Sequence, residues 1–198
     1  MPPQDSPTQI PRSDEIDNPN VIKVGVVGCG RIGLLHLEAL TKASGTIPII
    51  CSNPTIERAR QAAERFGIPE YCADAMDVIR HPRVHAVWIC SPSKFHAQQI
   101  IACAKNGKHV FCEKPIATDV QETILAIDAC RVAGVKFMIG LQRRFDRNFA
   151  RVKQAMDEKE VGDAFMVSAP LFGTVWEHHS EYLFRIISPF SSTWPLPY

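Results

Sequence analysis

The stretch Val24–Gly33, with the sequence VGVVGCGRIG, decides the fold of this chain. An apolar, β-branched run leads into three glycines in the spacing Gly-x-Gly-x-x-Gly, and a helical pattern follows. Strand, turn and helix in this order are the context in which such a spacing binds a dinucleotide. A turn whose glycines serve packing alone is the alternative interpretation.

Each glycine of this turn has its own task in a dinucleotide site. Gly28 permits the tight turn, Gly30 lets the backbone approach a pyrophosphate, and Gly33 lets helix and strand pack closely. Arg31 and Ile32 open the helix, whose N-terminus would face the negative charge of the cofactor. We therefore predict that these five residues bind the cofactor.

The pattern continues along the chain as short apolar strands that alternate with helices. Strands are expected at residues 21–27, 47–51, 86–90, 109–112 and 136–139. Helices are expected at residues 32–42, 55–66, 73–80, 94–106 and 118–133. In the last helix, Val120, Ile124 and Ile127 are expected to face inward. Such alternation predicts an α/β fold, a doubly wound parallel sheet of the Rossmann type.

Composition divides the chain into four expected segments. Residues 1–20 are polar and rich in proline, which predicts a disordered N-terminal leader. Residues 21–144 are expected to form the Rossmann domain, and residues 145–168 a linking helix and the first strand of a truncated second domain. Residues 169–198 are rich in aromatic side chains but lose periodicity. We expect an irregular C-terminal tail there, and a frame-shifted or non-coding origin is one hypothesis for it.

Overall composition excludes several classes of function. Lys and Arg number 22 against 21 Asp and Glu, so no global field favours nucleic acid as a partner. No apolar run is long enough to span a membrane and no secretory signal is evident, which favours a cytoplasmic protein. The 7 cysteines form no CxxC pair and are expected to be reduced, small apolar side chains. No metal site is predicted, and a homo-oligomer is left open.

The end of the second expected strand bears on the choice of cofactor. An acidic residue about twenty positions after the glycine turn normally binds the adenosine ribose. Here Asn53 is the nearest equivalent, and Arg58 follows on the next helix. A neutral amide can hydrogen-bond the ribose but lacks the charge that repels a 2′-phosphate. Asn53 and Arg58 are therefore candidate ligands of NAD or NADP, and a solvated Arg58 is the alternative.

A second motif follows the strands expected at residues 86–90 and 109–112, at the carboxyl ends where ligands bind in open α/β sheets. It consists of Ser91-Pro92, His96 and Cys112-Glu113-Lys114-Pro115. With the glycine turn and the stretch GLQRRFD at residues 140–146, these segments resemble the Gfo/Idh/MocA family of NAD(P)-dependent oxidoreductases, and most of all its inositol 2-dehydrogenase branch. The resemblance covers about residues 21–168.

The resemblance implies hydride transfer between a nicotinamide cofactor and a CH–OH group of a polyol or sugar. Lys114 would stand beside the nicotinamide and give a hydrogen bond or proton to the substrate oxygen, since partial desolvation brings a lysine pKa into a useful range. Glu113 would lie near the cofactor ribose. The nicotinamide side would be lined by Ser91, Pro92 and His96. An exposed loop lysine is the alternative for Lys114, and the bond before Pro115 is expected to be cis.

The resemblance also implies what this sequence lacks. Arg143 and Arg144 could orient a hydroxylated substrate, with solvated or salt-bridged arginines as the alternative. The family's second domain carries an Asp-x-x-x-His motif, and neither His178 nor His179 has an Asp four positions before it. We therefore expect one whole cofactor site beside half of an active site, and weak or absent activity in this chain. A non-catalytic NAD(P)-binding module or partner subunit, and a purely structural Rossmann domain, are the competing interpretations.

Overall fold

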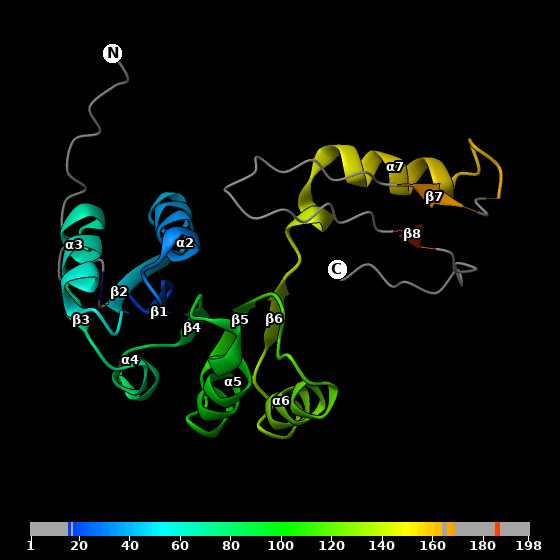
Figure 1. Ribbon diagram of the computed structural model, residues 1–198. Helices are drawn as coiled ribbons and strands as arrows, with labels where there is room; N and C mark the ends of the chain where they lie inside the picture. Colours follow the sequence, from blue (N-terminus) through cyan, green and yellow to red (C-terminus); the bar gives the residue numbers. More distant parts are fainter. Residues whose placement is uncertain (1–15, 17, 164–165, 169–184, 187–198) are drawn as a thin grey trace, which may run out of the picture. The chain divides into compact units, whose positions relative to one another are not determined.

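The computed structural model describes residue 16 and residues 18–163, 166–168 and 185–186. The chain divides into two compact units, residues 1–141 and 142–198. In the first unit an open sheet carries helices on both faces (Figure 1). The predicted leader, apart from its last few residues, and most of the predicted tail lie outside the described residues.

Six parallel strands form the sheet of the first unit, in the order β3-β2-β1-β4-β5-β6. Their bounds are β1 (Ile22–Val27), β2 (Thr46–Ser52), β3 (Glu70–Cys72), β4 (Ala86–Ile89), β5 (His109–Glu113) and β6 (Phe137–Gly140). The chain runs outward from β1 to β3, returns to β4 on the other side of β1, and runs outward again to β6. This arrangement confirms the predicted doubly wound parallel sheet.

Helices cover the two faces of the sheet in two groups (Figure 1). On one face lie α2 (Arg31–Lys42) and α3 (Ile56–Phe66). On the other lie α4 (Ala75–Arg80), α5 (His96–Lys105) and α6 (Val120–Val132). The short 3-10 helix η1 (Ser93–Phe95) precedes α5, where the sequence predicts one continuous helix. The chain moves from β1 toward β3 in the first half of the sheet and from β4 toward β6, the opposite direction, in the second half. Because the crossovers of both halves are right-handed, the helices of the two halves lie on opposite faces.

Buried aliphatic side chains fill the space between the sheet and each helical layer. Val24 and Val26 of β1 point toward α2, where Leu37 is fully buried with them. The intervening Gly25 faces the other layer, and a Cβ there would lie 2.4 Å from Cγ1 of Val78 in α4. The absence of a side chain at Gly25 is therefore what lets α4 approach β1 so closely.

The expectation for the inner face of α6 is wrong. The side chains of Val120, Ile124 and Ile127 are 70%, 46% and 42% exposed, whereas Ala126 and Cys130 are buried. The reason is the neighbouring helix, because α6 packs mainly against α5 and small side chains let two helices approach closely. Larger apolar residues of α6 therefore remain at its solvent-facing sides.

One element of the sheet has no counterpart in the expected strands. The strand β3 has only three residues and lies at the edge of the sheet, beside β2. Its residues are half-buried or exposed, so the sequence lacks the apolar run by which the other strands are found. This short strand places the loop before α4 beside the end of β2.

The described residues of the second unit form few elements. They are the 3-10 helix η2 (Gln142–Phe145), α7 (Arg147–Asp157), and two strands that pair antiparallel, β7 (Val167–Ser168) and β8 (Arg185–Ile186). Asp146 caps α7, since its Oδ1 accepts hydrogen bonds from the backbone N–H groups of Asn148 and Phe149 at 2.9 and 3.3 Å. Among the described residues of both units, no helix is long and apolar enough to cross a membrane.

Candidate cofactor site

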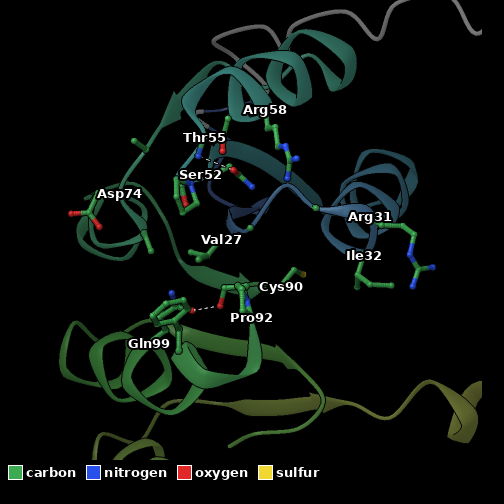
Figure 2. Close-up of a pocket in the computed structure, with 18 residues that line it drawn as sticks. Val27, Arg31, Ile32, Ser52, Thr55, Arg58, Asp74, Cys90, Pro92 and Gln99 are labelled. Atoms are coloured by element: carbon green, nitrogen blue, oxygen red, sulfur yellow. Dashed lines mark hydrogen bonds between the residues drawn. The ribbon is translucent and has the colours of Figure 1, made fainter. Parts of the chain in front are cut away.

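An open cavity of about 690 Å³ lies at the carboxyl ends of the strands. It forms where β1 and β4 lie side by side and the strand order reverses, so the loops after these strands part and leave room. Eight residues predicted to bind cofactor line it: Gly28, Gly30, Arg31, Ile32, Asn53, Arg58, Ser91 and Pro92. Four of them, Arg31, Ile32, Arg58 and Pro92, are labelled in Figure 2. The glycine turn, the end of β2 and the loop after β4 therefore surround one space.

The three glycines of the turn meet different surroundings. Gly28 has φ +97°, and a Cβ there would lie 2.7 Å from the backbone carbonyl of Cys90. A Cβ on Gly33 would lie 1.8 Å from the carbonyl oxygen of Gly28, so α2 packs directly on the turn. A Cβ on Gly30 would meet no described atom within 4 Å. Gly30 thus leaves open space in front of the N-terminus of α2, which fits the pyrophosphate of a dinucleotide.

The loops after β2 and β3 form the adenosine side of the cavity. The Oδ1 of Asn53 accepts a hydrogen bond from the backbone N–H of Thr55 at 2.9 Å, which leaves the amide NH₂ group to donate elsewhere. Asp74 also lines this side, and its Oδ1 caps α4 by accepting from the N–H of Met76 at 2.9 Å. Sequence reasoning missed Asp74 because it missed β3, which brings this loop to the site.

The loop after β4 forms the opposite wall. The Oγ of Ser91 donates a hydrogen bond to Oε1 of Gln99 in α5 at 2.6 Å (Figure 2). Gln99 and Phe95 both line the cavity and were not predicted. The helical period could have found Gln99, which follows His96 by three residues and so shares its side of α5.

His96 lies behind this wall and joins it to the motif that contains Lys114. Its side chain is 1% exposed. Nε2 lies 2.7 Å from the carbonyl oxygen of Ser91, and Nδ1 lies 2.7 Å from that of Pro115. A neutral imidazole has one N–H and can donate to only one of these oxygens, whereas an imidazolium can donate to both. His96 therefore connects the loops after β4 and β5.

Glu113, at the end of β5, connects the same region to α2. Its Oε1 lies 2.9 Å from Nε2 of His36, and its Oε2 accepts a hydrogen bond from the backbone N–H of Lys114 at 3.2 Å. The His36 ring also packs edge-on against Phe111, with ring centroids 5.0 Å apart. The side chain of Lys114 is exposed, and the bond between Lys114 and Pro115 is cis, as the resemblance implies. The carboxylate of Glu113 thus connects the backbone at Lys114 to α2, the helix that follows the glycine turn.

Two cysteines beside the second motif, Cys90 and Cys112, have the properties of packing residues. Burial raises the pKa of the Cys112 thiol to about 12, with a smaller contribution from the charge of Glu113. Burial also raises the pKa of Cys90 well above its ordinary value. A thiol with a raised pKa is a poor nucleophile near neutral pH. Neither side chain is suited to covalent catalysis.

The two arginines expected to orient substrate belong to the second unit. Arg143 lies in η2, with Nη1 3.7 Å from Oδ2 of Asp146 and its guanidinium 5.0 Å from the ring centroid of Phe149. Arg144 follows it in the same 3-10 helix and is exposed. Their substrate role stays a prediction.

Comparison of the sequence with known proteins identifies the family of this chain. The model of the Gfo/Idh/MocA oxidoreductase family, described as an NAD-binding Rossmann fold, matches residues 22–141. The myo-inositol 2-dehydrogenase of Thermotoga maritima is 37% identical over 141 residues, which cover 71% of this chain and 42% of that protein. The scyllo-inositol 2-dehydrogenase (NAD(+)) of Bacillus subtilis is 33% identical over 142 residues, with coverage of 71% and 42%.

Solved structures give the same result. The crystal structure of scyllo-inositol dehydrogenase from Lactobacillus casei with bound NAD(H) and scyllo-inositol is 34% identical, with a TM-score of 0.69. The match covers 72% of this chain and 43% of that one. The chain spans less than half the length of these relatives. It belongs to the Gfo/Idh/MocA family of oxidoreductases, and its first unit has the NAD-binding Rossmann fold of that family.

Proposed function

We propose that this chain binds NAD or NADP as part of an oxidoreductase that transfers a hydride between the nicotinamide and a CH–OH group of a polyol or sugar, as in an inositol 2-dehydrogenase. A Rossmann domain, which we assign to residues 21–144, would hold the cofactor. We assign residues 145–168 to the start of a second domain. A cytoplasmic location stays a prediction from the sequence.

The contact network around His96 is the observation that carries this proposal. One wall of the cavity, at Ser91, and the loop that presents Lys114 share this buried imidazole. A cofactor whose pyrophosphate occupies the space at Gly30 would extend from there across the ends of β1 and β4. The cofactor site and the candidate catalytic lysine are therefore parts of one edge of one sheet.

The residues of this chain would divide the work as follows. The bound cofactor supplies or accepts the hydride. The glycine turn and the N-terminus of α2 hold its pyrophosphate, and Asn53 hydrogen-bonds its adenosine ribose. Nζ of Lys114 gives a proton to the substrate oxygen in one direction of the reaction and removes it in the other. His96 and Glu113 position the backbone around Lys114.

A second candidate function is a non-catalytic NAD(P)-binding module or partner subunit. One observation favours it: the cavity is formed within the first unit, whereas Lys114 is exposed to solvent. A proton-transfer group usually works in a site from which water is excluded. The two candidates share the cofactor site and differ only in turnover.

Titration of the purified chain with NADH and NADPH, followed by an assay of myo-inositol, scyllo-inositol and sugar oxidation, tests the proposal. We expect saturable binding, followed by turnover that Lys114→Ala lowers by about a hundredfold or more, the usual contribution of a general acid or base. Lys105→Ala, which removes an exposed lysine of α5, is the matched control. Binding without turnover would favour the module, and binding of neither cofactor would refute both candidates.

A further inference from the structure

The adenosine end of the cavity carries no carboxylate where β2 ends. Ser52 closes the strand, and Asn53 is the first residue of the loop. Its amide is uncharged, and its NH₂ group is left to donate because Oδ1 already accepts from Thr55. The nearest acid in the cavity lining, Asp74, lies in the loop after β3 and caps α4. A carboxylate at position 53 would accept hydrogen bonds from the ribose hydroxyls and would repel a 2′-phosphate. The uncharged amide of Asn53 does not repel a 2′-phosphate.

Two arginines line the cavity without an ion-pair partner among the described residues, and of the two only Arg58 lies on the side of Ser52 and Thr55, where β2 ends. Arg58 extends from α3 toward the glycine turn, and Arg31 is the first residue of α2 (Figure 2). Both side chains are exposed, and both also line a neighbouring hollow of about 550 Å³ between these helices. Arg65 lines that hollow too, but there its charge acts on Glu38, whose pKa is lowered first by Lys42 and also by Arg65. Arg58 therefore brings to the side of Asn53 a positive charge that forms no ion pair with a described acid.

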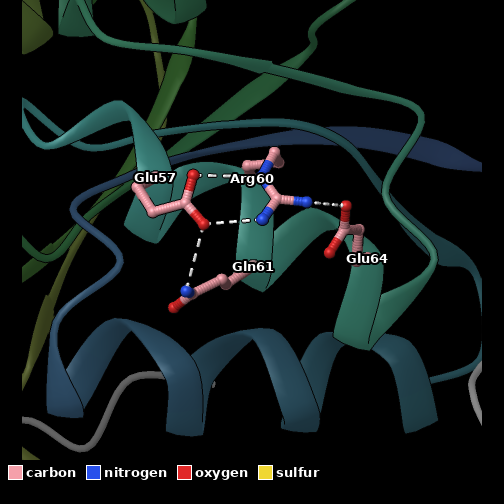
Figure 3. Close-up of polar contacts among 4 residues, drawn as sticks. All are labelled: Glu57, Arg60, Gln61 and Glu64. Atoms are coloured by element: carbon pink, nitrogen blue, oxygen red, sulfur yellow. Dashed lines mark hydrogen bonds and ion pairs between the residues drawn. The ribbon is translucent and has the colours of Figure 1, made fainter.

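The next arginine of α3, Arg60, differs from Arg58 because it is paired with acidic side chains. Arg60 bonds Oε1 of Glu57 at 2.6 Å and also bonds Glu64, while Gln61 donates to the same Glu57 oxygen at 3.2 Å (Figure 3). The hydrogen bond to Glu57 and the charges of both carboxylates raise the pKa of Arg60. Acidic residues of α3 thus pair with Arg60 and leave Arg58 unpaired.

We propose that this site accepts the 2′-phosphate of NADP(H), with Arg58 as the specificity-determining residue and Asn53 as a neutral hydrogen-bond donor. A guanidinium donates two parallel hydrogen bonds to a phosphate, and such charge-assisted bonds are about twice as strong as neutral ones. The inference rests on the proposed cofactor function and names the cofactor form of that same site.

Paired titrations of the full chain with NADPH and NADH, followed by nicotinamide fluorescence, test the inference. We expect NADPH to bind at least as tightly as NADH, with the stronger dependence on salt of the two. In Arg58→Ala the ratio of NADPH to NADH affinity should fall about tenfold or more, the size expected for one charge-assisted hydrogen bond. In Asn53→Asp the ratio should fall in the same direction, because the new carboxylate repels the 2′-phosphate.

Arg60→Ala is the matched control, since it removes the same charge from the same helix at a position already paired. It should leave the ratio unchanged within about twofold. If NADH binds and NADPH does not, or if Arg58→Ala and Arg60→Ala shift the ratio equally, the 2′-phosphate site is refuted while the dinucleotide site stands. Failure of both cofactors to bind would refute the proposed function and this inference with it.

Discussion

At the scale of single residues, the glycine turn separates a folding requirement from a binding requirement. A Cβ at position 33 would lie 1.8 Å from the carbonyl oxygen of Gly28, whereas one at position 30 would meet open space. Gly33→Ala should therefore lower the free energy of unfolding by about 2 to 3 kcal/mol, because a backbone atom has to move. Gly30→Ala should keep its stability and weaken NADH binding. Urea denaturation with fluorescence titration checks both, and a stable Gly33→Ala would contradict the close approach.

The buried thiols supply a second prediction at this scale. Burial raises the pKa of Cys103 and of Cys112 to about 12 each. At pH 8 only about one such thiol in ten thousand is ionised, and the thiolate is the reactive form. We expect both thiols to react with a disulfide reagent only after the chain unfolds in urea. Rapid modification of either in the native protein, located by mass spectrometry, would show that the site is less buried than described.

At the scale of elements, the pair of His36 and Glu113 ties α2 to the end of β5. The two side chains are 2.9 Å apart and only 24% and 18% exposed, so solvent screens their interaction less than that of a surface pair. A double-mutant cycle with His36→Ala and Glu113→Gln should give a coupling energy of about 1 kcal/mol. The exposed pair Arg131 and Asp128 of α6 is the control, for which we expect at most about 0.5 kcal/mol. Equal coupling in the two cycles would mean that the first pair does not join the elements.

The elements also show where a sequence suffices and where it does not. The end of α3 was predictable because Gly67, with φ 65°, follows an amphipathic run and needs no distant partner. The buried side of α6 was not predictable, because it depends on packing against α5. Ala126 and Cys130 are buried there, whereas Val120 is exposed. Local patterns predict an element, and its neighbours decide which side of it is buried.

At the scale of the whole molecule, the candidate site shows the same division. The residues around Gly28 were predictable because turn, strand and helix are continuous in sequence. Asp74 was not, since its place depends on an edge strand of three residues. The burial of His96 was also not predictable from the sequence, because one of its hydrogen-bond partners, Pro115, is 19 residues away. The net charge was no guide to the charge at the site. The chain has a net charge of only +1, yet Arg58, which pairs with no acid among the described residues, lines the same cavity as Asn53.

The double contact of His96 has a consequence for how the site can move in time. To separate the loops after β4 and β5, the molecule has to break the contacts of a buried imidazole with the carbonyl oxygens of Ser91 and Pro115. Movement of one loop alone would take that carbonyl oxygen away from the buried ring. We therefore expect the two loops to move together, and hydrogen exchange should show similar protection for both.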